Sequence, residues 1–120
     1  MHPKDAEKAV EIGLNGIIVS NHAGRQFNGA VTSIDALPAI VDAVGGKTKI
    51  LFDSGVRTGL DIMRALSLGA DFVLLGRGFV YGVAALGKYG GDHVVEILKE
   101  DLTNNMVQLG VENVRQLSGL

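Results

Sequence analysis

The chain has 120 residues, 47% of them hydrophobic, with 17 glycines, a formal net charge of −2 at pH 7 and a sequence pI near 5.8. That length allows one modest domain, residues 1–120, and the weakly acidic balance with few aromatic side chains argues against a surface that binds nucleic acid. The sequence has no cysteine, no apolar run of membrane-spanning length and no signal-peptide pattern, so we expect a cytoplasmic protein without disulfides or thiolate metal sites.

The first predicted element is a helix that begins near Pro3 and stops at Gly13, since Pro3 and Asp5 suit a first helical turn. The next segment, Gly16–Val19, is apolar and β-branched without alternation, which predicts a strand buried on both faces of a parallel sheet. Small and polar residues then turn the chain outward at Ser20-Asn21-His22-Ala23-Gly24-Arg25. Functional side chains are expected at such a strand end.

His22 and Arg25 are the candidate catalytic and substrate-binding residues in this turn. Histidine exchanges a proton near neutral pH, and the planar guanidinium of arginine matches a carboxylate in a bidentate manner. Together they indicate a substrate that carries a carboxylate. The alternative is an ordinary loop in which His22 caps backbone groups and Arg25 reaches solvent.

The middle of the chain continues the alternation of helices and strands. The predicted elements are a helix over 34–44 with Ser33 as its N-cap and Pro38 in its first turn, a strand at Lys49–Asp53, a helix at Leu60–Leu68 and a strand at Phe72–Leu75. This order makes a parallel sheet with covering helices. Three strands in 120 residues fit either the second half of a (β/α)₈ barrel, which needs roughly 250 residues, or a small open α/β domain.

The last third is predicted to contain one long helix. Gly82–Gly91 is expected to be a glycine-rich connection, followed by a helix from about Asp92 to Leu109. Its apolar stripe is expected at Val95, Leu98, Leu102, Met106 and Leu109, and its solvated face at Glu96, Lys99, Glu100 and Asp101. The tail, Val111–Leu120, is expected to be a loosely packed turn or short helix.

Two successive strand ends pair glycine with arginine, in Ser54-Gly55-Val56-Arg57 and in Gly76-Arg77. Glycine lets backbone amides approach an anion, the following helix adds its positive N-terminal end, and arginine adds charge-assisted hydrogen bonds. The repetition predicts a phosphate site. The alternative is that the glycines only turn the chain and the arginines are surface charges. Asp53 either caps the next turn or accepts hydrogen bonds from ligand hydroxyls.

Three motifs in fixed order identify a family resemblance. Ser20-Asn21-His22-x-Gly24-Arg25-Gln26, Asp53-Ser54-Gly55-Val56-Arg57-x-Gly59 and Leu75-Gly76-Arg77 resemble the FMN-dependent α-hydroxy acid oxidases and dehydrogenases, of the lactate oxidase type. The resemblance implies the C-terminal half of a TIM barrel that binds FMN and oxidises a small L-2-hydroxy acid to the 2-oxo acid. It implies that His22 is the base, Arg25 binds the substrate carboxylate, and Asp53 faces the ribityl chain. The residues that it places around the phosphate are Ser54, Gly55, Arg57, Gly76 and Arg77.

The sequence departs from the family pattern in two places and in its extent. Ala23 stands where glycine is common, which strains the turn if that position has a positive φ, and Gly78 replaces a common proline. The chain is expected to begin just beyond the fifth barrel strand, so its partners would be the N-terminal half of the barrel or further copies in a homo-oligomer. We therefore expect no activity from the chain alone. The alternatives are a non-catalytic FMN- or phosphate-binding half-barrel and a structural fragment that self-associates.

Overall fold

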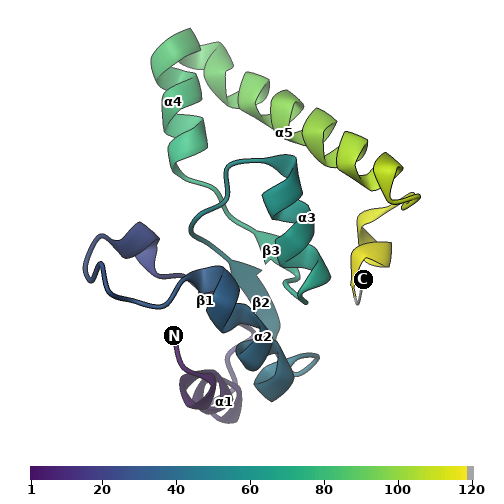
Figure 1. Ribbon diagram of the computed structural model, residues 1–120. Coiled ribbons are helices and arrows are strands. Elements are labelled where there is room, and N and C mark those ends of the chain that lie inside the picture. Colours follow the sequence, from purple (N-terminus) through teal and green to yellow (C-terminus); the bar gives the residue numbers. More distant parts are fainter. Residues whose placement is uncertain (119–120) are drawn as a thin grey trace.

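The structure, a computed structural model, describes residues 1–118. Three parallel strands pair in the order β1-β2-β3, with β1 at Gly16–Val19, β2 at Lys49–Phe52 and β3 at Phe72–Val73. The helices are α1 (Pro3–Glu11), α2 (Ser33–Val44), α3 (Gly59–Ser67), α4 (Arg77–Leu86) and α5 (Gly90–Gln108), with short 3₁₀ helices η1 (His22–Gly24), η2 (Gly87–Tyr89) and η3 (Val114–Leu117). Figure 1 shows α2 and α3 beside the sheet and α4 and α5 extending from it. The predicted α/β fold with three parallel strands is confirmed.

Helices cover one face of the sheet. Val19, Ile50 and Phe52 lie on the covered face in the main core and are 1%, 1% and 2% exposed. Side chains alternate between the two faces of a strand, and Ile18 and Phe72 lie on the opposite face, each 59% exposed. Both pair in register with Leu51 of the central strand. The expectation of strands buried on both faces is therefore wrong for these two side chains.

β3 is shorter than predicted, and Asp71, just before β3, is hydrogen-bonded to β2. The carboxylate of Asp71 accepts hydrogen bonds from Lys49 Nζ at 2.6 Å and from the Ile50 amide at 2.9 Å. The Lys49 ammonium first, and then the Ile50 amide, hold the pKa of Asp71 below its usual range. Beyond the end of β3, the Leu74 amide still donates to the Phe52 carbonyl at 2.8 Å. The predicted Phe72–Leu75 strand thus retains one further ladder bond.

α2 begins one residue before the predicted start. The N-cap is Thr32, whose Oγ1 accepts from the Asp35 amide at 3.3 Å, rather than Ser33. The Ser33 side chain is instead buried and accepts a 3.0 Å hydrogen bond from the amide of Asn21. This bond ties the turn after β1 to the start of α2. Pro38 lies in the second helical turn, not the first.

The predicted connection at Gly82–Gly91 is wrong, because the chain forms α4 before a short turn leads into α5. Gly82 and Gly90 lie where the two helices meet. A Cβ on Gly82 would come within 2.4 Å of Val94 Cγ2, and one on Gly90 within 2.1 Å of the Gly82 carbonyl oxygen. These glycines allow close helix packing, whereas a sequence pattern suggests that they break helices.

The C-terminal part packs on α3 more firmly than predicted. Leu98 and Met106 of the expected stripe are buried, but Val95 and Leu109 are 47% and 56% exposed. The predicted short helix is present as η3, but Leu117 in it is 0% exposed and packs with Met106, so the described part of the tail is anchored at this residue and not loosely packed there. The end of that predicted tail, at 119–120, lies outside the described residues.

Asp101 of α5 contacts α3, although the charge pattern predicts that it lies on a solvated face. Its Oδ2 accepts a 2.6 Å hydrogen bond from the Gly59 amide, the first residue of α3. The closeness depends on Gly59, where a Cβ would lie 2.1 Å from the Leu102 backbone nitrogen. α5 therefore fixes the start of α3. None of the helices within residues 1–118 is long and apolar enough to cross a membrane.

Candidate active site

The turn after β1 carries the predicted base in an unusual backbone conformation. His22, Ala23 and Gly24 have φ values of +50°, +55° and +73°, so three successive residues are left-handed. For a residue with a Cβ this region costs roughly 1–2 kcal/mol. The concern raised by Ala23 is therefore justified, since its position has a positive φ.

Hydroxyl groups hold this turn against the end of β2. The amide of His22 donates to Ser20 Oγ and the amide of Ala23 donates to Ser54 Oγ, both at 3.1 Å. The Ser20 hydroxyl donates to Asp53 Oδ2, and the Ser54 hydroxyl donates to the same oxygen at 3.0 Å. Asp53 thus accepts from two hydroxyls that in turn accept from the histidine turn.

The imidazole of His22 has one hydrogen-bond partner among residues 1–118. Nδ1 lies 2.7 Å from Gln26 Oε1, and a carbonyl oxygen only accepts hydrogen bonds. Nδ1 therefore carries the hydrogen in the neutral ring, and Nε2 keeps the lone pair that a general base requires.

The turn after β2 leads into a helix whose first amides are already bonded. Thr58 and Asp61 form a capping box, and Asp61 Oδ2 also accepts from the amide of Arg57 at 3.1 Å. With the Gly59 amide bonded to Asp101, the start of α3 has little capacity left for an anion. The prediction that this helix end adds to a phosphate site is not supported by these contacts.

The turn after β3 differs, because α4 begins without a side-chain cap. Gly76 is the N-cap residue and makes no capping hydrogen bond, so the first amides of α4 are open to an anion. Arg77 is the first residue of the helix, and a Cβ at Gly76 or Gly78 would meet no atom within 4 Å. Neither Arg57 nor Arg77 forms an ion pair with a carboxylate of residues 1–118.

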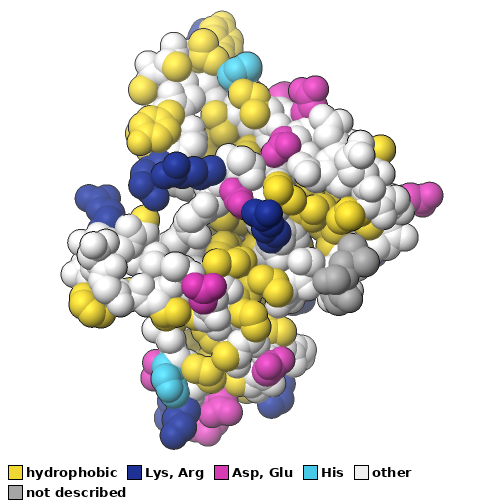
Figure 2. All heavy atoms as spheres, in the orientation of Figure 1, with side chains coloured by type: hydrophobic (Ala, Val, Ile, Leu, Met, Phe, Trp, Pro, Cys, Tyr) yellow, Lys and Arg dark blue, Asp and Glu magenta, His cyan; other side chains and the backbone are white. Residues whose placement is uncertain are grey.

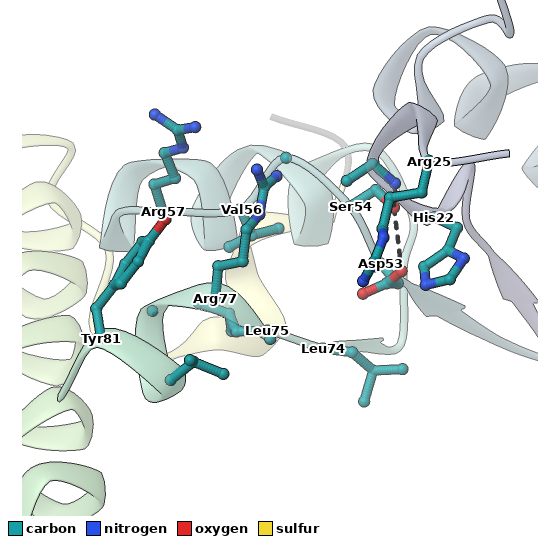
Figure 3. Close-up of a pocket in the computed structure, with 15 residues that line it drawn as sticks. His22, Arg25, Asp53, Ser54, Val56, Arg57, Leu74, Leu75, Arg77 and Tyr81 are labelled. Atoms are coloured by element: carbon teal, nitrogen blue, oxygen red, sulfur yellow. Dashed lines mark hydrogen bonds between the residues drawn. The ribbon is translucent and has the colours of Figure 1, made fainter. Parts of the chain in front are cut away.

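All of the predicted site residues line one cavity of about 780 Å³. They are His22, Arg25, Asp53, Ser54, Gly55, Arg57, Gly76 and Arg77. Figure 3 shows His22, Arg25 and Asp53 at one end of this cavity and Arg57 at the other, with Arg77 between them. In Figure 2 basic side chains gather on the left of the molecule, between α4 and the loop after β1. The cavity therefore has a histidine end, with His22, Arg25 and Asp53, and a cationic end, with Arg57 and Arg77.

Three residues that contribute to the site have no role in the sequence-based prediction. Ser20 and Gln26 bond to the histidine turn and to the imidazole, and both belong to the first quoted motif. Tyr81 lines the cationic end of the cavity from α4. A tyrosine in a glycine-rich connection is expected to anchor the loop, but 69% of Tyr81 is exposed. Recognising α4 as a helix beginning at Arg77 would have placed Tyr81 one turn beyond that arginine.

Fold and site together define a class: part of an α/β barrel whose strand ends carry a histidine and several arginines around one cavity. Residues 1–119 match the family described as FMN-dependent dehydrogenase, and the chain belongs to this family.

Similar proteins and structures agree with that membership. An L-lactate dehydrogenase of Xanthomonas campestris pv. campestris (strain B100) is 50% identical over 119 residues, which are 99% of this chain and 31% of that protein. One from Pseudomonas paraeruginosa is 49% identical over 118 residues, 98% of this chain and 31% of that protein. Mandelate oxidase with benzoyl-formic acid superimposes with a TM-score of 0.95 at 41% identity, covering 99% of this chain and 36% of that one. The chain thus spans about a third of the length of these relatives.

Proposed function

We propose that this chain supplies the catalytic base and the FMN-phosphate site of an enzyme that oxidises a small, lactate-like L-2-hydroxy acid to the 2-oxo acid. The observation that carries the proposal is the single cavity that collects a histidine, an arginine near it and two further arginines. Membership of the FMN-dependent dehydrogenase family supports the cofactor. The relatives named for lactate and mandelate support a 2-hydroxy acid substrate.

The cationic end of the cavity fits the phosphate of FMN. Arg57 and Arg77 have no carboxylate partner among the described residues, and the uncapped start of α4 adds backbone amides. Such groups bind a dianion through charge-assisted hydrogen bonds. Ser54 and Gly55 complete the wall, while Asp53 keeps Oδ1 without a partner in residues 1–118 and would accept from the ribityl chain.

The other end of the cavity fits the substrate. His22 Nε2 would take a proton from the 2-hydroxy acid, and Arg25 would hold its carboxylate in a bidentate pair. When bound, FMN accepts the two electrons that leave the substrate. The tautomer fixed by Gln26 keeps the basic nitrogen away from that side chain.

The chain is proposed to be inactive alone, because it spans about a third of its relatives. The uncovered face of the sheet exposes Ile18 and Phe72, and β1 and β3 are edge strands. Apolar faces and open edges favour pairing with further strands. We propose that the N-terminal part of the barrel covers this face, and that the complete protein is a cytoplasmic homo-oligomer. Without the N-terminal part, the chain is proposed to self-associate.

A non-catalytic FMN- or phosphate-binding half-barrel is the second candidate. It is favoured by the cationic end of the cavity, whose arginines and open helix start all come from this chain. This candidate predicts flavin binding without substrate oxidation.

The test compares the chain alone with the chain co-expressed with the N-terminal two thirds of the Xanthomonas campestris L-lactate dehydrogenase. FMN is added, free flavin is removed, and L-lactate is mixed in without oxygen while the flavin absorbance is followed. We expect bleaching only in the combined sample. Bleaching by the chain alone would contradict the proposed incompleteness. An assembled barrel that keeps FMN but never bleaches would instead support the binding module.

A further inference from the structure

Ser54 has a backbone conformation that its residue type does not favour. Its φ is +87°, in a region where glycine is the usual residue. Strain of this kind persists only where the surroundings determine the conformation. Gly55 beside it also has a positive φ, +84°, which glycine adopts without strain. At Ser54 the contacts of the hydroxyl are what can hold the strained conformation.

The Ser54 hydroxyl joins two strand ends that are far apart in the sequence. It donates to Asp53 at the end of β2 and accepts from the Ala23 amide in the turn after β1. Ser20 makes the equivalent pair of bonds, with the same Asp53 oxygen and the His22 amide. The two hydroxyls lie 3.1 Å apart. Figure 3 shows Ser54 directly above Asp53, beside His22.

These bonds meet the turn at its two strained non-glycine residues. His22 and Ala23 are the two left-handed residues of the turn that have a side chain. The amide of His22 donates to the Ser20 hydroxyl, and the amide of Ala23 donates to the Ser54 hydroxyl. A hydrogen bond that exists only in the left-handed form shifts the local equilibrium toward that form. Because the acceptor hydroxyls both donate to a carboxylate, each is oriented with its lone pairs toward the turn.

We propose that Ser54, together with Ser20, is a positioning residue that holds the His22–Gly24 turn in its left-handed conformation through Asp53. The strain at Ser54 is retained because glycine at that position would leave the Ala23 amide without its acceptor. The stabilisation of the turn backbone does not depend on the proposed function. Its consequence for catalysis, an imidazole aimed into the cavity, rests on the proposed function.

The test measures amide hydrogen exchange by mass spectrometry in the full 120-residue chain, with peptides that cover 20–26 and, as reference, 59–68. Ser54→Gly removes the hydroxyl and also relieves the backbone strain. We expect exchange protection in 20–26 to fall roughly two- to tenfold, the value of one hydrogen bond, while protection in 59–68 stays the same or rises. Ser20→Ala should produce the same local loss, and Ser20→Thr, which keeps a hydroxyl, should restore protection.

Two results would overturn the proposal. One is unchanged protection of 20–26 in both Ser54→Gly and Ser20→Ala. The other is an equal loss in both peptides with no rescue by Ser20→Thr, which is the pattern of general destabilisation. Failure of the proposed function is separate, because it would appear as unaltered flavin reduction after His22 is replaced and would leave these exchange rates as they are.

Discussion

Gly59→Ala is predicted to destabilise the protein strongly, because α3 begins in direct contact with the backbone of α5. An added Cβ would lie 2.1 Å from the Leu102 nitrogen, 2.6 Å from its Cα and 2.7 Å from the Asp101 carbonyl carbon. All three are backbone atoms, so no side-chain rotation relieves the overlap. The helices must separate, and the 2.6 Å bond from the Gly59 amide to Asp101 is then lost.

The magnitude follows from these two effects. Overpacking costs about 1–3 kcal/mol and a hydrogen bond to a charged group about 1.5–3 kcal/mol, which together give about 2.5–6 kcal/mol. A small domain has about 5–15 kcal/mol of stability, so the loss is a large fraction of the total. The urea midpoint, followed by far-UV circular dichroism, should fall by about 1 M or more.

Gly78→Ala is the matched control for this prediction. Gly78 lies in α4, where an added Cβ would meet no atom within 4 Å, so alanine there should be neutral or add up to about 1 kcal/mol through helix propensity. An unchanged midpoint for Gly59→Ala, or equal losses in both variants, would refute the reasoning about close helix packing.

Three further predictions concern the cavity and the strand pair beneath it. Arg57→Ala and Arg77→Ala should each weaken FMN retention in the completed barrel about 10- to 150-fold by equilibrium dialysis, while Arg115→Ala in η3 should not. Arg25→Lys should raise KM for the hydroxy acid, because lysine lacks the bidentate fork, and an unchanged KM would exclude Arg25 as the carboxylate partner. Asp71→Asn should lower the free energy of unfolding at pH 7 by less than about 1 kcal/mol, because the ion pair with its lysine partner is exposed. The pKa of Asp71 is lowered in the folded state, so its contribution to the free energy of unfolding is present above the unfolded pKa of ~3.9 and is lost as pH falls further. Equal losses of stability in Asp71→Asn at pH 7 and at pH 2 would contradict this reasoning.

The strand ends were predictable because the chemistry changes abruptly there. Val19 is followed by Ser20, and Phe52 by Asp53, so polar residues mark where each strand meets the cavity edge. Parallel strands place these ends together, which is why the site residues line one cavity. The family resemblance then supplied the expected roles.

The remaining features depend on contacts between distant segments. Asp101 has a charge pattern typical of a solvated helix face, and only the fold brings it to Gly59, 42 residues earlier. Gly82 and Gly90 lie in a glycine-rich stretch that is typical of a loop, and only the close packing of α4 on α5 explains why glycine is needed at these positions. The apolar pattern alone predicts a strand buried on both faces, but three strands cannot fill the inner face of a barrel, so apolar surface is expected to face water, as it does at Ile18.

The central claim is that this chain carries the base of a flavin-dependent 2-hydroxy acid oxidation. The most direct measurement is anaerobic stopped-flow reduction of the flavin by L-lactate in the completed barrel, with His22 or with His22→Ala. We expect the variant to keep FMN and to reduce it about 10²- to 10⁴-fold more slowly, the usual contribution of a positioned general base. Reduction at the parent rate with full FMN content would contradict the assignment of His22 as the base.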